Sequence, residues 1–299
     1  MMEKILVLMA TYNGEKYIEE QLESLFSQED VEVSLLVRDD GSTDSTCQIL
    51  DRWGQTHPVS WYAEGHLGAK YGFLELVGRA LSSDADYFAF CDQDDVWDSD
   101  KLNIALRQLQ MAEPGKPALY YCGQRLVDEK LQPLSVHKLN SKRTMPARFV
   151  FGDIAGCTGV FNRALAEAVA AYRPEYLRMH DLWIMKVCCA LGGQVFVDPE
   201  AHIAYRQHGN NVEGLSNSLR SKINRFGRYY RHDITAHMQQ LKLGYGDKLC
   251  TEYGALIDRI LLCREKPGAR WALLRQYNID FCNKGIALAF FLKVLFNKI

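Results

Sequence analysis

Three widespread active-site motifs are absent from this 299-residue sequence. The turn after the first apolar run reads Ala-Thr-Tyr-Asn-Gly at 10–14, not GxGxxG, which argues against a dinucleotide-binding site. There is no GxxxxGK(S/T), which excludes a P-loop protein. There is also no GxSxG nucleophile elbow, which argues against an α/β-hydrolase.

Paired cysteines, a secretory signal and a strong net charge are also lacking. The nine cysteines form no CxxC pair and no Cys/His metal spacing, so we expect reduced thiols in a cytoplasmic protein. Residues 1–9 form a short strand-like run without a cleavage site. The formal net charge of −2 gives no reason to expect nucleic acid as a partner.

The first half of the chain alternates strand-like and helix-like segments. Apolar runs predict strands at 4–9, 33–37, 59–62, 87–91 and 118–122. Helical spacing predicts helices at 16–28, 43–53, 71–81 and 101–111. This alternation predicts an α/β fold with a mostly parallel sheet and helices on both faces. We expect a loop-rich stretch at 128–148, helices near 163–172 and 182–191, and a helical, basic region from about 212 onward.

The first acidic motif, Asp-Gln-Asp-Asp at 92–95, follows the strand predicted at 87–91. Ligands in such sheets bind beyond the carboxyl ends of the strands. Three close carboxylates repel one another unless a cation joins them, and Mg²⁺ or Mn²⁺ prefers oxygen ligands. The alternative is a solvated turn that caps the next helix, which suits Asp98 and Asp100.

The second acidic motif, Arg-Asp-Asp-Gly-Ser-Thr-Asp at 38–44, follows the strand predicted at 33–37. A carboxylate of Asp39 or Asp40 could accept the N3–H of a pyrimidine base. Thr11, Tyr12 and Asn13 could contact the ribose and the base. The alternative is a turn that begins the next helix.

Together these motifs resemble glycosyltransferase family 2, which has the GT-A fold. The resemblance covers roughly residues 3–211. It rests on the segments at 10–14, 39–44, Leu-Gly-Ala-Lys at 67–70, Cys-Asp-Gln-Asp-Asp-Val-Trp at 91–97, His-Asp-Leu-Trp at 180–183 and Tyr-Arg-Gln-His-Gly-Asn-Asn at 205–211. The pattern is similar to the bacterial rhamnosyltransferase branch, which builds capsular, cell-wall or O-antigen polysaccharides.

The resemblance implies a role for individual residues. It implies that Asp40 reads the pyrimidine, that Tyr12 stacks near it and that Lys70 lies near the nucleotide. Asp92 and Asp94 match the Asp-x-Asp motif that binds the nucleotide and a divalent cation, Mn²⁺ or Mg²⁺, with Asp94 as the more direct ligand. His208 matches a late metal or phosphate contact; the alternative is a loop histidine.

Asp181 matches the catalytic base of the family. An inverting transfer needs a carboxylate that takes the acceptor proton. The alternative is helix capping. The family usually has Glu or Thr-Glu before this base, whereas this sequence has His180. Contacts to the sugar or acceptor are expected from Asp95, Trp97, Gly156, His180 and Trp183; the alternative for Gly156 is a tight turn before a helix.

The C-terminal region carries two features of its own. Residues 219–231 interleave arginines and a lysine with aromatic and aliphatic residues, as in helices that lie on anionic lipid. The apolar run at 285–299 is too short to span a bilayer. The alternative is packing on the catalytic core or on a second subunit in a homodimer. We expect a catalytic domain at 1–211, with halves at 1–124 and 125–211, and a helical region at 212–299.

The sequence therefore predicts an inverting glycosyltransferase, with dTDP-β-L-rhamnose as the expected donor and a saccharide or polyprenyl-linked acceptor. It is expected in the cytoplasm, as a peripheral protein on the inner face of the membrane. One alternative is a UDP-glucose, UDP-galactose or UDP-GlcNAc donor. Another is a non-catalytic subunit of a polysaccharide assembly complex, against which the presence of Asp92, Asp94 and Asp181 argues.

Overall fold

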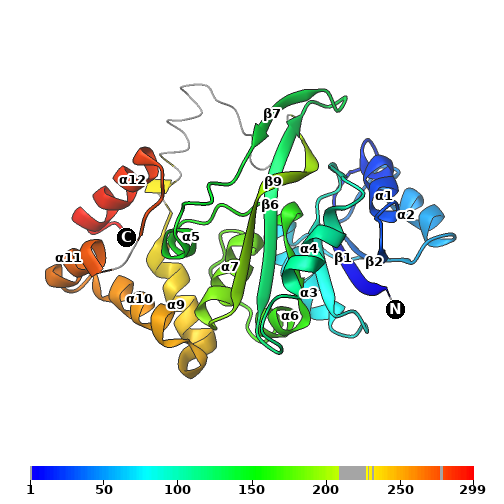
Figure 1. Cartoon of the computed structure of the whole chain (residues 1–299). Coiled ribbons are helices and arrows are strands. Elements are labelled where there is room, and N and C mark those ends of the chain that lie inside the picture. Colours follow the sequence, from blue (N-terminus) through cyan, green and yellow to red (C-terminus); the bar gives the residue numbers. More distant parts are fainter. Residues whose placement is uncertain (1, 209–226, 228, 231, 277–278) are drawn as a thin grey trace.

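The computed structural model describes residues 2–208, 227, 229–230, 232–276 and 279–299, and within them nine strands form one sheet (Figure 1). The strands are β1 (Glu3–Thr11), β2 (Val31–Asp39), β3 (Val59–Ala63), β4 (Tyr87–Cys91), β5 (Val96–Trp97), β6 (Ala118–Val127), β7 (Pro133–His137), β8 (Val160–Asn162) and β9 (Gln194–Arg206). Their order is β3-β2-β1-β4-β8-β6-β9-β5, with β7 paired to β6. The pairs among β1 to β4 are parallel, whereas β8 is antiparallel to both β4 and β6.

Helices flank the sheet and continue beyond it. They are α1 (Ile18–Phe26), α2 (Thr46–Gly54), α3 (Gly68–Ala80), α4 (Lys101–Leu109), α5 (Met145–Val150), α6 (Arg163–Ala170), α7 (His180–Ala190), α9 (Ile234–Tyr245), α10 (Thr251–Leu262), α11 (Pro267–Gln276) and α12 (Lys284–Leu295). Two short 3₁₀ turns lie at Gly156–Thr158 and Gly246–Lys248.

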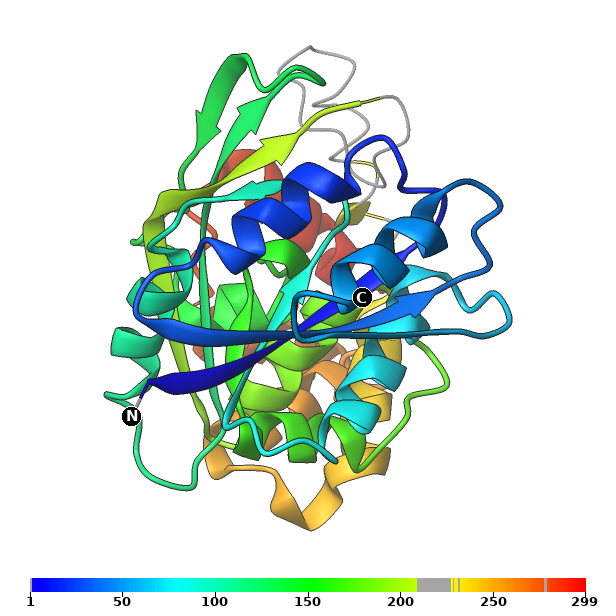
Figure 2. The same cartoon turned by 90° about the vertical axis from the view of Figure 1, so that its right-hand side faces the viewer.

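Strand β1 shows how the two faces of the sheet are covered. Its residues alternate between two apolar cores, with Ile5 and Val7 in one and Leu6 and Leu8 in the other. Helices α1, α2 and α4 pack in the first core, and α3, α6 and α7 pack in the second. Figure 2 shows α1 and α2 on one side of the N-terminal strands and α3 on the other. The apolar run at 4–9 therefore marks a strand buried on both faces, and the predicted α/β class with a mostly parallel sheet is confirmed.

The site lies where the strand order reverses. The chain passes from β1 outward to β2 and β3, and then crosses back to β4 on the other side of β1. The loops after β1 and β4 therefore open side by side at the carboxyl edge of the sheet. This is the position at which open α/β sheets bind ligands.

The structure differs from the sequence-based expectations in several elements, and the short strands β5 and β8 were among those not predicted. The stretch expected as loop, 128–148, contains β7 and the start of α5. The 13-residue strand β9 was not predicted, because charged residues interrupt its apolar side chains and most of them are only half buried. Parallel pairing with β9 also extends β6 to Val127, five residues beyond the predicted end.

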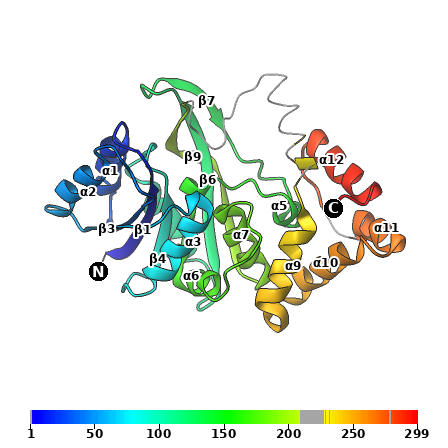
Figure 3. The ribbon, with the colours of Figure 1, turned by 180° about the vertical axis from the view of Figure 1, so that it is seen from behind.

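The C-terminal helices α9 to α12 form the end of the molecule that lies farthest from β1–β3 (Figures 1 and 3). Their buried side chains, including Met238, Ile257 and Phe290, belong to the same apolar core as α7. No helix within the described residues has the length and apolar character that a bilayer span requires. The expected domain boundary at residue 211 and most of the basic stretch at 219–231 lie outside the described residues.

Candidate functional site

A large cavity of 1260 Å³ opens at the carboxyl edge of β1 and β4. Of the predicted site residues, ten line it: Thr11, Tyr12, Asn13, Asp40, Asp92, Asp94, Gly156, His180, Asp181 and His208. Segments that are up to 197 positions apart in the sequence, from Thr11 to His208, thus meet at one cavity.

The loop after β1 is held in shape by the loop after β2. The Thr11 hydroxyl donates to Asp39 Oδ2 at 2.9 Å, and Asn13 Oδ1 accepts from the backbone N–H of Thr43 at 2.8 Å. Asp39 also accepts from the backbone N–H groups of Gly41 and Ser42. Asp39 is fully buried and is absent from the cavity wall. Its carboxylate therefore holds the loop, and a direct nucleotide contact is not its role in this structure.

Asp40 lies at the wall of the same end of the cavity. It forms a buried ion pair with Arg38, and it accepts from the backbone N–H of Gly68 at 2.7 Å. The His66 ring stands edge-on to the Tyr12 ring with 5.6 Å between centroids, and Tyr12 is 51% exposed. An exposed aromatic ring beside a fixed carboxylate is suited to a planar, hydrogen-bonding base.

Gln93 links the loops after β1 and β4. Sequence analysis did not identify it as a site residue. Its Oε1 accepts from the Tyr12 N–H at 3.0 Å, and its Nε2 donates to the Tyr12 carbonyl at 3.2 Å. A Cβ on Gly14 would displace the side-chain amide of Gln93 from this position, so the glycine permits the close approach. The acidic motif and the predicted base-stacking residue are thereby fixed to each other.

The carboxylates of Asp92, Asp94 and Asp181 line the same cavity. Burial, together with the negative charges of Asp94 and Asp181, raises the pKa of Asp92 to about 7. Like charges at this separation favour either a shared proton or a bound cation. The electrostatics therefore agree with the prediction that the motif at 92–95 holds a positive ion.

His208 completes this group from the far end of the sequence. Its Nε2 lies 2.6 Å from Asp94 Oδ2, and its ring stacks on Tyr17 with 5.2 Å between centroids. The imidazole is thus oriented by one carboxylate and one aromatic ring. An oxygen and nitrogen donor set of this kind suits Mn²⁺ or Mg²⁺.

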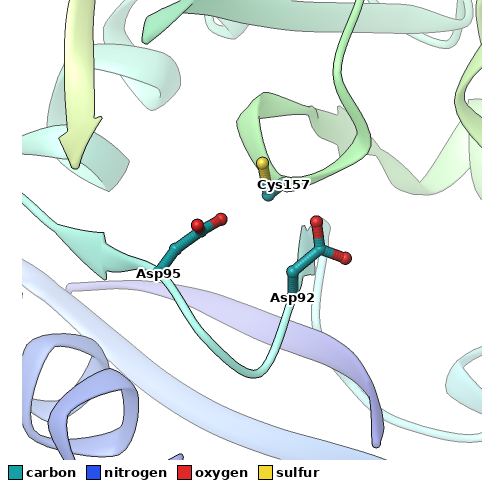
Figure 4. A group of neighbouring side chains, drawn as sticks. All are labelled: Asp92, Asp95 and Cys157. Carbon is teal, nitrogen blue, oxygen red and sulfur yellow. The ribbon is translucent and has the colours of Figure 1, made fainter. Parts of the chain in front are cut away.

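Two groups of three residues bring possible ligand atoms within 4.8 Å of one another among the described residues, and neither is the predicted set. One is Asp98, Asp100 and His202. The other is Asp92, Asp95 and Cys157, whose side chains point toward one another (Figure 4). Burial raises the pKa of the Cys157 thiol well above its usual value, which keeps it protonated.

A protonated thiol is a poor ligand for a hard cation. Asp95 is fully buried and off the cavity wall, and Cys157, which borders the cavity, is only 1% exposed. Asp92, Asp94 and His208 all line the open cavity. The donor set therefore fits a divalent cation best at these three residues.

Arg206 clamps the acidic loop from the end of β9. Its Nε donates to the Asp94 carbonyl at 2.8 Å, and its backbone N–H donates to Asp95 Oδ1 at 3.1 Å. The guanidinium also pairs with Glu20 and lies over the Tyr17 ring. Arg206 thus positions both the Asp-x-Asp loop and the ring on which His208 stacks.

Asp181 lies in the first turn of α7 and lines the cavity. Its Oδ1 accepts from the Leu182 N–H at 2.6 Å. The preceding residue, His180, stacks on Phe73 with 4.0 Å between centroids, and burial lowers its pKa to about 3. His180 is therefore neutral at neutral pH. A Cβ on Gly156 would come within 2.5 Å of His180 Nε2, so the glycine allows this turn to approach the ring.

Four other predicted contacts lie off the cavity wall. Asp95, Trp97 and Trp183 are at most 3% exposed, because Trp97 packs beneath Lys101 and Trp183 lies in the core of α7. Lys70 donates to the Leu177 carbonyl at 3.4 Å, one residue beyond the cavity-lining Ala69. Asp95, Trp97 and Trp183 are thus buried off the cavity wall, whereas the exposed Lys70 lies beside it.

The cavity continues well past the predicted residues. This second part, called the acceptor end below, is lined by His137, Lys138, Leu139, Asn140, Arg143, Gly152, Asp153, Ile154, Arg178, Met179, Leu182, Tyr229, Phe281, Cys282, Asn283, Gly285 and Ile286. Apart from Leu182, no motif marked these residues, because they come from separate segments that include a hairpin, a helix start and the turn before α12. Only the folded structure shows that these residues line one cavity.

Comparison with known proteins bears on the class of the fold and the site. The family model described as glycosyl transferase family 2 matches residues 6–169. The dTDP-rhamnosyl transferase RfbG of Shigella flexneri is 28% identical over 76% of this chain and 82% of its own length. The putative teichuronic acid biosynthesis glycosyltransferase TuaG of Bacillus subtilis is 31% identical over 43% of this chain and 49% of its own length.

Solved structures share the fold. TarS of S. aureus in complex with UDP-GlcNAc superposes with a TM-score of 0.58 at 17% identity, covering 97% of this chain and 81% of TarS. The mannosyltransferase PcManGT of Pyrobaculum calidifontis, in complex with GDP-Man and Mn²⁺, gives a TM-score of 0.57 at 19% identity, covering 97% and 75%.

The fold is that of the GT-A glycosyltransferases. Because the family model covers more than half of the sequence, this chain belongs to glycosyl transferase family 2.

Proposed function

We propose that this protein is an inverting glycosyltransferase that uses Asp181 as its base and dTDP-β-L-rhamnose as its donor. The observation that supports it most is the shared cavity, which Asp181 lines together with Asp92, Asp94, Tyr12 and Asp40. A binding subunit would have no use for a base beside a cation site. The similarity to a dTDP-rhamnosyl transferase supports the choice of donor.

Each end of the cavity has its own part in this reaction. The Tyr12 ring and the Asp40 carboxylate would hold the thymine, with Thr11 and Asn13 beside the ribose. The acceptor hydroxyl would approach Asp181 from the acceptor end and pass its proton to that carboxylate as it attacks the anomeric carbon. The bond from that carbon to the diphosphate breaks on the opposite side, which inverts the configuration.

Asp92, Asp94 and His208 would hold the divalent cation, Mn²⁺ or Mg²⁺. When bound, it offsets the charge of the departing diphosphate. His208 is already oriented by Asp94 and Tyr17, and Arg206 fixes the loop that carries Asp94. These contacts hold the metal-ligand atoms in place before substrate binds. Such preorganised groups supply much of the electrostatic stabilisation in enzymes.

The acceptor is proposed to be a saccharide, carried on a polyprenyl lipid, in the synthesis of a bacterial surface polysaccharide. This would place the enzyme at the cytoplasmic face of the membrane. The expected division into a catalytic domain at 1–211 and a helical region at 212–299 also stands as a proposal.

A donor panel tests the proposal. The purified protein is incubated with Mn²⁺ or Mg²⁺ and, in separate reactions, dTDP-rhamnose, UDP-glucose, UDP-galactose and UDP-GlcNAc, and release of the nucleoside diphosphate is measured. We expect dTDP-rhamnose to be turned over fastest. Faster turnover of a UDP-sugar would show that dTDP-rhamnose is not the preferred donor. No turnover of any donor, with or without saccharide acceptors, would contradict the proposal that the protein is an enzyme.

A further inference from the structure

Helix α12 is held firmly on the body of the protein by one of its faces. Ala289, Phe290 and Val294 are buried in the core, and the Phe290 ring packs 5.4 Å from that of Phe281. Lys293 is buried as well, and its Nζ donates to the carbonyls of Tyr230 and Lys298 at 2.7 Å each. The opposite side of α12 is therefore a fixed surface of the molecule.

That opposite side is apolar. Leu288, Phe291 and Leu295, spaced by three and four residues, are 51%, 41% and 42% exposed, and Phe296 just beyond the helix is 60% exposed. These four residues are called the outer face of α12 below. Large apolar side chains gathered on one exposed helix face mark an interaction surface.

The charge of this region favours an anionic occupant. Residues 263–299 contain seven Lys and Arg but only two Asp and Glu, in a chain whose net charge is −2. Lys284 and Lys298, both exposed, bracket the outer face. A helix with an apolar face and basic residues at its borders is suited to the surface of an anionic bilayer, where it lies in the plane of the headgroups. A second copy of the same face would bring like charges together.

The outer face begins at the acceptor end of the cavity. Asn283, Gly285 and Ile286, at the start of α12, line the cavity, and Leu288 follows within the next turn. A membrane that covers the outer face would therefore lie next to the opening through which the acceptor must enter. This juxtaposition suits an acceptor whose carrier is embedded in the bilayer.

We propose that the outer face of α12 docks on an anionic phospholipid surface and presents the acceptor end of the cavity to a lipid-carried saccharide. The second part rests on the proposed function, whereas the docking itself does not. The docking surface is Leu288, Phe291, Leu295 and Phe296, with Lys284 and Lys298 at its borders.

Co-sedimentation with vesicles tests the docking. The full chain is mixed with vesicles of phosphatidylglycerol and phosphatidylcholine, or of phosphatidylcholine alone, at low and high salt. The test variant combines Leu288→Gln, Phe291→Gln and Leu295→Gln, which removes apolar surface without changing charge. The matched control combines Met111→Gln and Leu243→Gln, which are 61% and 71% exposed and lie away from the cavity.

We expect the wild type and the control to bind the anionic vesicles, more weakly at high salt, and the test variant to lose about tenfold or more in partitioning. Equal binding by the test variant and the wild type would overturn the proposal. So would a dimer in vesicle-free solution that only the test variant converts to monomer, since the face would then be a subunit contact. Donor turnover in solution is measured for all three proteins; its absence would sink the proposed function and leave the docking result standing.

Discussion

The two ends of the cavity are built in opposite ways. The donor end consists of short loops that directly follow β1, β2 and β4, and its carboxylates lie within sequence motifs. The acceptor end is assembled from residues 137–143, 152–154, 178–182 and 281–286, which no motif connects. The difference shows that the part of the cavity proposed to bind the nucleotide is local in sequence, whereas the part proposed to face the acceptor depends on the tertiary fold.

The largest expected effect separates the base from nucleotide binding. Asp181→Asn removes the proton acceptor but keeps the size of the side chain and its contact to the Leu182 N–H. We expect the transfer rate to fall by about 10²- to 10⁴-fold, while the dissociation constant for dTDP changes little. Steady-state transfer assays and nucleotide titration measure the two quantities. A parallel loss in both would assign Asp181 a structural role.

The next effect concerns the cation. Asp94→Ala removes the carboxylate that holds His208, so we expect turnover to fall about 100-fold or more and the Mn²⁺ requirement to rise; His208→Gln should lose about tenfold. His202→Gln, from the other group of possible ligands, is the matched control and should leave the Mn²⁺ dependence unchanged. Full wild-type activity in EDTA would contradict the cation site.

A third prediction concerns the pH dependence of the stability of the protein, to which buried histidines near the acceptor end of the cavity contribute. Burial lowers the pKa of His180 to about 3 and lowers those of His232 and His237 as well, all near the acceptor end. The unfolded chain takes up these protons below about pH 6.5 and the folded chain does not. Each histidine therefore costs about 1.4 kcal/mol of stability per pH unit as the pH falls from 6.5 toward the folded pKa.

Urea unfolding at pH 7, 6 and 5 checks this. We expect His180→Phe to reduce the loss of stability between pH 6 and pH 5 by about 1 kcal/mol, because the unfolded chain no longer takes up a proton at this position. His66→Phe, at a histidine whose side chain is 67% exposed, is the control and should follow the wild type. An identical pH dependence in His180→Phe and the wild type would show that His180 does not contribute.

The smallest expected effect is on the joint between the two donor loops. Gln93→Ala removes both hydrogen bonds to the backbone of Tyr12. Because these bonds position the base-stacking ring and touch no reacting atom, we expect KM for the donor to rise about fivefold with kcat nearly unchanged. A selective loss of kcat would instead place Gln93 at the reacting centre.

Sequence reasoning reached most of the donor end and little of the acceptor end. The strand before each motif could be predicted, because a strand buried on both faces is a continuous apolar run, as in Phe88–Cys91. The location of the site could be predicted because ligands bind at strand ends. The burial of individual side chains within the motifs could not be predicted. Asp39, Trp97 and Trp183 share motifs with cavity residues but face inward, and only packing decides this.

The residues that sequence reasoning missed act through tertiary contacts. Gln93 stood between two selected aspartates, yet its role depends on the proximity of the loop after β1. Arg206 was within the quoted motif at 205–211, and its clamp on Asp94 becomes visible only once β9 lies beside β6. Phe281 and Ile286 could not be found, since apolar residues near a helix start carry no chemical signature.

The most direct test of the account is calorimetric titration of dTDP into the wild type, Asp94→Ala and Asp181→Asn, each with and without Mn²⁺. The account predicts that Mn²⁺ strengthens dTDP binding to the wild type and to Asp181→Asn by about the same factor, and that Asp94→Ala loses this gain. If Mn²⁺ strengthened binding to Asp94→Ala as much as to the wild type, the cation site at Asp92, Asp94 and His208 would be contradicted.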